Sequence, residues 1–206
     1  LTTVSLAANA FGEAKTVRIA NLTAMTSLVF QPGSFGRCRQ LLIGNLSSLT
    51  ELEFGAKSLP NVDALAIVDF PLLTTLRTHA NALSAVKELE LRDLPVFTSI
   101  YAGYYSLPKV QTLELTALPA FTTLVTEDSA FYSTSLYMHD LPAFSSFASF
   151  NNSRYNFLGT LHLANLEQLH TIDLSHSQLN NPLRLKIENL NNVEAIILGP
   201  ESLVRA

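Results

Sequence analysis

The stretch LPAFTTL, residues 118–124, returns three more times along the chain in nearly the same form. The related stretches are FPLLTTL (70–76), LPVFTSI (94–100) and LPAFSSF (141–147). Around them, apolar positions recur with a 24-residue period through the whole sequence. A constant period of this length predicts a solenoid, in which each repeat forms one turn and neighbouring turns bury a continuous core.

Three apolar columns keep this period across the 206 residues, which predicts about eight and a half turns. The second column starts at Phe11 and the third at Val4. A one-residue deletion after Phe131 and an insertion near 151–153 account for the few irregular steps. The first column contains Ile19, Ile43, Ile67, Leu91, Leu115, Met138, Leu163 and Ile187.

Each repeat contains two short strand patterns. The first is L-x-L, as at 89–91 and 113–115, and the second starts at a hydroxyl residue, as at 122–126. Strict alternation turns the leucines to one side, and the Pro, Gly and Asx residues between the patterns leave no stretch long enough for a helix. We therefore predict a mainly β solenoid with two parallel sheets facing each other and little or no helix. It forms a single domain over 1–206, and because neither end has a polar cap we expect a segment of a longer array.

Two polar columns mark the corners of the turns. Asx side chains bond to backbone groups in bends and tolerate unusual dihedral angles, so the first column is expected to be structural. Its members are Asn21, Asn45, Asp69, Asp93, Asp140, Asn165 and Asn189, and only Ala117 interrupts it. The second column is expected to open the second strand and to bond locally. It contains Thr2, Thr26, Thr50, Thr74, Thr98, Thr122 and Ser145.

The repeat resembles the leucine-rich repeat family, and within it the BspA-like type of bacterial and protist surface proteins. The residues that carry the resemblance are SFGRCRQLLI (34–43), similar to the Phe-x-x-Cys-x-x-Leu core of that type. The cysteine position is divergent in the other repeats, where it is Val62, Val86, Val110, Thr134 and Leu158. The resemblance implies an extracellular or cell-surface protein that acts in adhesion, recognition or scaffolding.

Composition excludes some classes of partner. Charged residues make up 15% of the chain, the net charge is −4, and Lys and Arg are not clustered, so we expect no nucleic-acid partner. The sequence contains no run of about 18 apolar residues, so we expect no transmembrane segment in this stretch. Cys38 is the only cysteine, so no intrachain disulfide can form, which leaves the compartment open.

The densest group of candidate binding residues lies in LRTHA (76–80) and SIYAGYYS (99–106). In a 24-residue solenoid these two stretches lie on neighbouring turns, and Tyr and Arg are enriched at interface hot spots. The alternative is that they are ordinary surface residues, since exposed aromatic side chains also occur singly. The candidates are Arg77, His79, Tyr101, Tyr104 and Tyr105.

We expect neither a metal site nor a catalytic site in this chain. His170, Asp173 and His176 are close in sequence, but on a strand their side chains diverge. No nucleophile–base set has a supporting context, so we predict no enzyme, no metal and no cofactor. Three Asn-x-Ser/Thr sequons occur, at Asn21, Asn45 and Asn151, and Asn151 is the better N-glycosylation acceptor because the other two belong to the Asx column.

The leading hypothesis is a non-enzymatic interaction or adhesion solenoid that binds a protein or glycan partner at a cell surface or outside the cell. The alternative is a structural protomer that binds a second copy of itself through uncapped ends and forms an extracellular filament, since a heterologous contact that does not close extends indefinitely.

Overall fold

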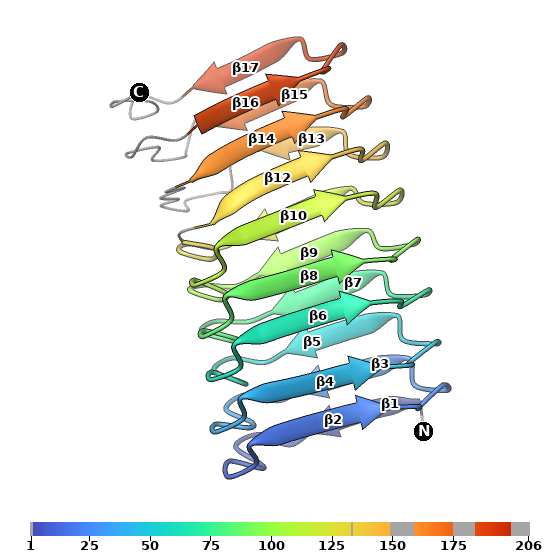
Figure 1. Ribbon diagram of the computed structural model, residues 1–206, viewed down its shortest axis with the longest axis vertical. Helices are drawn as coiled ribbons and strands as arrows, with labels where there is room; N and C mark the ends of the chain where they lie inside the picture. Colours follow the sequence, from blue (N-terminus) through green and yellow to red (C-terminus); the bar gives the residue numbers. More distant parts are fainter. Residues whose placement is uncertain (1, 133, 149–158, 175–183, 199–206) are drawn as a thin grey trace.

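The chain forms a parallel β-solenoid with a 24-residue period, as the repeat predicts. The computed structural model describes residues 2–132, 134–148, 159–174 and 184–198. In these residues every regular element is a strand, and the strands alternate between two sides of the stack (Figure 1). No helix within the described ranges is long and apolar enough to cross a membrane.

The two strand patterns of the repeat form the two sides. The L-x-L pattern forms the even-numbered strands: β2 (Thr16–Ala20), β4 (Gln40–Gly44), β6 (Ala64–Val68), β8 (Glu88–Arg92), β10 (Thr112–Thr116), β12 (Ser135–His139), β14 (Thr160–Ala164) and β16 (Arg184–Glu188). The second pattern forms the odd-numbered strands: β1 (Thr3–Leu6), β3 (Ser27–Phe30), β5 (Glu51–Phe54), β7 (Thr75–Thr78), β9 (Ser99–Ala102), β11 (Thr123–Thr126), β13 (Ser146–Ala148), β15 (Thr171–Leu174) and β17 (Ala195–Leu198).

Within a sheet, each strand pairs in parallel with the strand one turn later on the same side, and the pairing is interrupted between β4 and β6 and between β11 and β13. The odd side contains the sheets β1-β3-β5-β7-β9-β11 and β13-β15-β17, and the even side contains β2-β4 and β6-β8-β10-β12-β14-β16. Leu52 of β5 pairs with Leu76 of β7, which has the same place one turn later. Leu113 of β10 pairs with Leu136 of β12, a step one short of the regular period, and Leu136 pairs with Leu161 of β14, a step one longer. These two steps confirm the predicted deletion and insertion.

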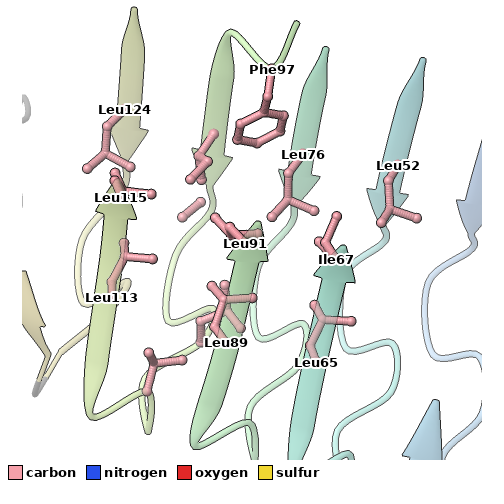
Figure 2. Close-up of a cluster of buried hydrophobic side chains, with 14 of the residues drawn as sticks. Leu52, Leu65, Ile67, Leu76, Leu89, Leu91, Phe97, Leu113, Leu115 and Leu124 are labelled. Carbon is pink, nitrogen blue, oxygen red and sulfur yellow. The ribbon is translucent and has the colours of Figure 1, made fainter. Parts of the chain in front are cut away.

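The core lies between the two sides and is built from the predicted apolar columns. Leu91 of β8 is 5% exposed, and Leu115 of β10 and Ile100 of β9 are fully buried. Figure 2 shows leucines of even strands pointing toward Leu76 and Leu124 of the odd strands, with Phe97 beside them. The first turn is less buried: Phe11 is 58% exposed although its ring stacks on Phe35, 5.0 Å away.

The corners are made by residues with left-handed backbone. All eight positions of the Asx column, Ala117 included, have φ between 50° and 61°. A second left-handed column is chemically mixed: Asn9, Gly33, Lys57, Asn81, Tyr105 and Ser129. The third consists of large apolar residues: Phe11, Phe35, Leu59, Leu83, Leu107 and Phe131.

Left-handed backbone costs a residue such as Leu about 1–2 kcal/mol, and burial offsets this cost. Leu59, Leu83 and Leu107 are fully buried, and burying a leucine side chain contributes about 1.5–3 kcal/mol. The strained backbone therefore persists because it directs the side chain into the core.

The threonine column links each turn to the one before it. The Thr74 hydroxyl donates to the carbonyl oxygen of Thr50 at 2.9 Å, and that carbonyl also accepts from the Thr74 backbone N–H at 2.9 Å. The same hydroxyl contact joins Thr26 to Thr2, Thr50 to Thr26, Thr98 to Thr74 and Thr122 to Thr98. These five hydroxyls thus bond to the turn before, 24 residues earlier, and not only locally as the sequence predicts.

Candidate functional site

The solenoid brings the five predicted binding residues to neighbouring turns on the odd side. Arg77 of β7 lies directly opposite Tyr101 of β9. The guanidinium carbon of Arg77 is 4.5 Å from the centre of the Tyr101 ring, which is a cation–π contact. Both side chains are partly exposed, so the pair presents a cation and an aromatic ring on the outer face of the sheet.

His79 joins this group through a residue that the sequence analysis did not select. Glu53 of β5 lies opposite Arg77, and its Oε1 atom is 2.8 Å from Nε2 of His79. The His79 side chain is 47% exposed and that of Glu53 is 27% exposed. The signal for Glu53 was present in the sequence, because it has the same place as Arg77 in the outward column, one repeat earlier.

Tyr104 and Tyr105 lie in the corner that follows β9. They are 49% and 44% exposed, and their ring centres are 6.3 Å apart. The Tyr104 backbone N–H donates to Oε2 of Glu127 at 2.9 Å, and the Tyr104 carbonyl accepts from the Asn81 N–H at 2.8 Å. These bonds fix the corner to the turns before and after it.

Gly103 allows the tyrosine corner to approach the preceding turn. A Cβ atom at Gly103 would lie 2.9 Å from the carbonyl carbon of His79 and 2.9 Å from the oxygen of Thr78. Both are backbone atoms, which cannot move aside without distorting the turn. The corner with Tyr104 and Tyr105 therefore packs directly on the backbone that follows β7. We call Glu53, Arg77, His79, Tyr101, Tyr104 and Tyr105 the tyrosine patch.

The Asx column makes a ladder of side chains along another corner. Nδ2 of Asn45 donates to Oδ1 of Asn21 at 2.8 Å, and the same contact links Asn165 to Asp140 and Asn189 to Asn165. These bonds run between side chains one turn apart rather than to the backbone amides that the sequence analysis considered. The sequon residues Asn21 and Asn45 thus bond to each other, while Asn151 lies outside the described residues.

A second cluster of ionisable side chains lies on the even side, on the opposite face of the solenoid. His162 of β14 is only 9% exposed although it is on an outward position. Its Nδ1 is 3.0 Å from Nε2 of His139, and its Nε2 is 2.8 Å from Oε2 of Glu188. Nζ of Lys186 is 2.8 Å from the same Glu188 oxygen. Lys186 and then His162 lower the pKa of the Glu188 carboxyl group.

Local packing explains how His162 reaches both partners. Ala164 lies between His139 and Glu188 in the sheet, and its side chain is small enough to leave space for the His162 ring on the outer face. The His162 ring bridges the two diagonally, and the Tyr137 ring packs against it with 5.9 Å between centres. We call Tyr137, His139, His162, Lys186 and Glu188 the histidine cluster. The sequence analysis missed it because its members come from three different repeats, in a part of the chain where the repeat is irregular.

The residues considered for a metal site from sequence do not form this cluster. His170 is exposed in the corner before β15, Asp173 is a half-buried residue of β15, and His176 lies outside the described residues. In the described ranges, no group of three or more His, Cys, Asp or Glu side chains is placed so that all of them could hold one metal ion.

The outer face of the even side also carries a groove. Ala64 and Ala66 of β6 lie between Leu42 of β4 and the acidic side chains Glu88 and Glu90 of β8, and the hollow measures about 800 Å³. A groove of this size is within the usual range of binding sites.

Comparison with protein-family models, curated proteins and solved structures finds no match to this chain. Its class is therefore defined by its fold alone, as a parallel β-solenoid built from 24-residue repeats.

Proposed function

We propose that this chain is a non-enzymatic interaction module of an extracellular or cell-surface protein, and that it binds a protein or glycan partner through the tyrosine patch. The observation that carries the proposal is the exposure of Tyr104 and Tyr105 beside the Arg77–Tyr101 pair. Aromatic and arginine side chains on a rigid support are the residues that contribute most to binding energy at interfaces.

The rigidity of the patch supports this proposal. Tyr101 is held in a strand that pairs on both sides, and the corner of Tyr104 is bonded to two neighbouring turns. Side chains already held in place lose less conformational entropy when a partner binds. Because Arg77 and His79 each contact a neighbour in the patch, the partner meets a surface whose charges are already arranged.

Localisation and adhesion are inferred from the resemblance to BspA-like leucine-rich repeats. That resemblance depends on the 24-residue period and on the stretch 34–43, where Phe35 and Cys38 are both buried. Both residues therefore occupy core positions, as the Phe-x-x-Cys-x-x-Leu pattern requires.

Binding of the purified chain to intact cells and to an array of glycans tests the proposal. The triple variant Tyr101→Ala, Tyr104→Ala, Tyr105→Ala should lose binding at least tenfold while its circular dichroism stays that of a β protein. Tyr137→Ala, which removes a tyrosine from the opposite face, should bind like the wild type. Equal binding by the triple variant would remove the tyrosine patch as the site.

The alternative function is a protomer that assembles end to end. In the described residues, the strands of one side pair in parallel and therefore run in the same direction. A second copy stacked on either end could continue both sheets in register. Filaments in electron micrographs of the concentrated chain are expected under this alternative, whereas uniform monomers would contradict it.

A further inference from the structure

The histidine cluster holds two ring nitrogens close together. Nε2 of His139 and Nδ1 of His162 are 3.0 Å apart, and the two rings meet edge to face with 4.3 Å between their centres. His162 is nearly buried, whereas His139 is half-buried. The His162 ring is therefore held by its neighbours, and the His139 ring lies nearer to solvent.

The contact with Glu188 determines which His162 nitrogen carries the lone pair. A carboxylate only accepts hydrogen bonds, so the nitrogen that faces it, Nε2 of His162 at 2.8 Å, carries the proton. In the neutral ring, Nδ1 of His162 is therefore unprotonated and its lone pair is on the side of His139. A histidine that donates its other N–H to a carboxylate is the usual arrangement around protein-bound metals.

The separation of the two nitrogens matches that of two ligands on one ion. Two nitrogens about 2.0–2.1 Å from a metal, at angles of about 90–110°, lie about 2.9–3.4 Å from each other. The observed 3.0 Å falls in this range, although the two rings must turn so that both lone pairs meet at one ion instead of sharing a proton. We propose that His139 and His162 bind a divalent transition-metal ion, with Glu188 as the outer carboxylate that orients His162.

Binding moves one proton between the two nitrogens of His139. For the neutral form of both rings, that proton occupies Nδ1 instead of Nε2, and each ring donates one lone pair to the ion. With two protein ligands, water fills the remaining positions, which leaves them open to a ligand from a partner. Imidazole nitrogen favours copper, nickel and zinc over magnesium, with Cu²⁺ bound most tightly.

Titration calorimetry of the purified chain with Cu²⁺, Zn²⁺ and Mg²⁺ in a buffer that does not bind metals tests the proposal. We expect one ion per chain, tighter binding of Cu²⁺ than of Zn²⁺, and no binding of Mg²⁺. His139→Ala should weaken Cu²⁺ binding at least tenfold, and this half-buried position should tolerate the change. Glu188→Gln should weaken it about 10–100-fold by removing the outer carboxylate.

Two other histidines provide matched controls. His170→Ala removes an exposed histidine from a corner, and His79→Ala removes the histidine that is paired with Glu53 on the opposite face. Both should bind Cu²⁺ like the wild type. In addition, ¹⁵N spectra should show Zn²⁺ shifting the ring nitrogens of His139 and His162 together. The proposal is overturned if the wild type binds no Cu²⁺ at millimolar concentration, if His139→Ala binds as tightly, or if either control abolishes binding.

Discussion

The side-chain amide of Asn45 donates a 2.8 Å hydrogen bond to the side-chain oxygen of Asn21, which has the same place one turn earlier. Both residues have left-handed backbone, with φ of 50° and 61°. Asn tolerates this conformation better than other residues with a Cβ atom. The Asx column thus has two roles, because it makes the corner and also bonds one turn to the next.

Ala117 lacks both the tolerance of Asn for left-handed backbone and a side chain that can bond to the next turn. This leads to a first prediction. It has φ of 51°, and it lies between Asp93 and Asp140 in the column. Ala117→Asn should lower the backbone strain and let the new amide donate to Asp93, adding about 0.5–1 kcal/mol of stability. For a chain of this size, the melting temperature should rise by about 1–4 °C. Ala117→Asp is the control, since it adds a like charge and no donor, and an equal rise would contradict the ladder argument.

The fold was predictable because one number, the 24-residue period, determines the register of all turns except those with the deletion and the insertion. That Arg77 lies opposite Tyr101 also follows from this period, and so does the position of Glu53 next to Arg77. The mixed left-handed column from Asn9 to Ser129 was not predictable, because its members share a backbone conformation but no side-chain chemistry.

The histidine cluster could not be predicted from the repeat period, for a different reason. His139, His162 and Glu188 do not share one column, and their contacts are diagonal across β12, β14 and β16. These contacts depend on the small side chain of Ala164, which lies between His139 and Glu188 in the sheet. Sequence reasoning compared histidines that are near in the chain, such as His170 and His176, and these are not members of the cluster.

A second prediction concerns the core. Leu91→Asp places an unpaired charge at a position that is 5% exposed, and we expect a loss of more than about 4 kcal/mol, enough to unfold much of the array. Leu42→Asp is the matched control, because Leu42 is 56% exposed on the outer face and lies opposite Arg18. It should change stability by less than about 0.5 kcal/mol in urea denaturation. If both variants lose the same stability, the assignment of inner and outer faces is wrong.

A third prediction links packing to the tyrosine patch. Gly103→Ala should cost about 1–3 kcal/mol, because the added methyl group meets the backbone of Thr78 and His79. It should also weaken any partner that binds the patch, since the corner with Tyr104 must move outward. Gly36→Ala is the control, as a Cβ atom there meets nothing within 4 Å. Thermal denaturation of both variants would detect the difference, and equal melting temperatures would show that the contact at Gly103 does not limit the fold.

The last prediction concerns Cys38 and alkaline pH. The thiol is fully buried and its Sγ donates to the Gln40 carbonyl at 3.2 Å. Burial raises the pKa of the Cys38 thiol above its ordinary value of 9.0. The folded state therefore holds this proton to higher pH than the unfolded state does. Its contribution to stability is complete below about pH 9 and is lost as the pH rises through the raised folded value.

Cys38→Val isolates this effect, because valine occupies the same position in the repeats of Val62, Val86 and Val110 and cannot ionise. The free energy of unfolding in urea should fall more steeply between pH 8 and pH 10.5 for the wild type than for the variant. The other groups that titrate in this range are shared by both proteins, so their contribution cancels in the difference. Parallel pH profiles would show that the Cys38 thiol keeps access to water, and rapid reaction of the folded wild type with a thiol reagent at pH 8 would support the same conclusion.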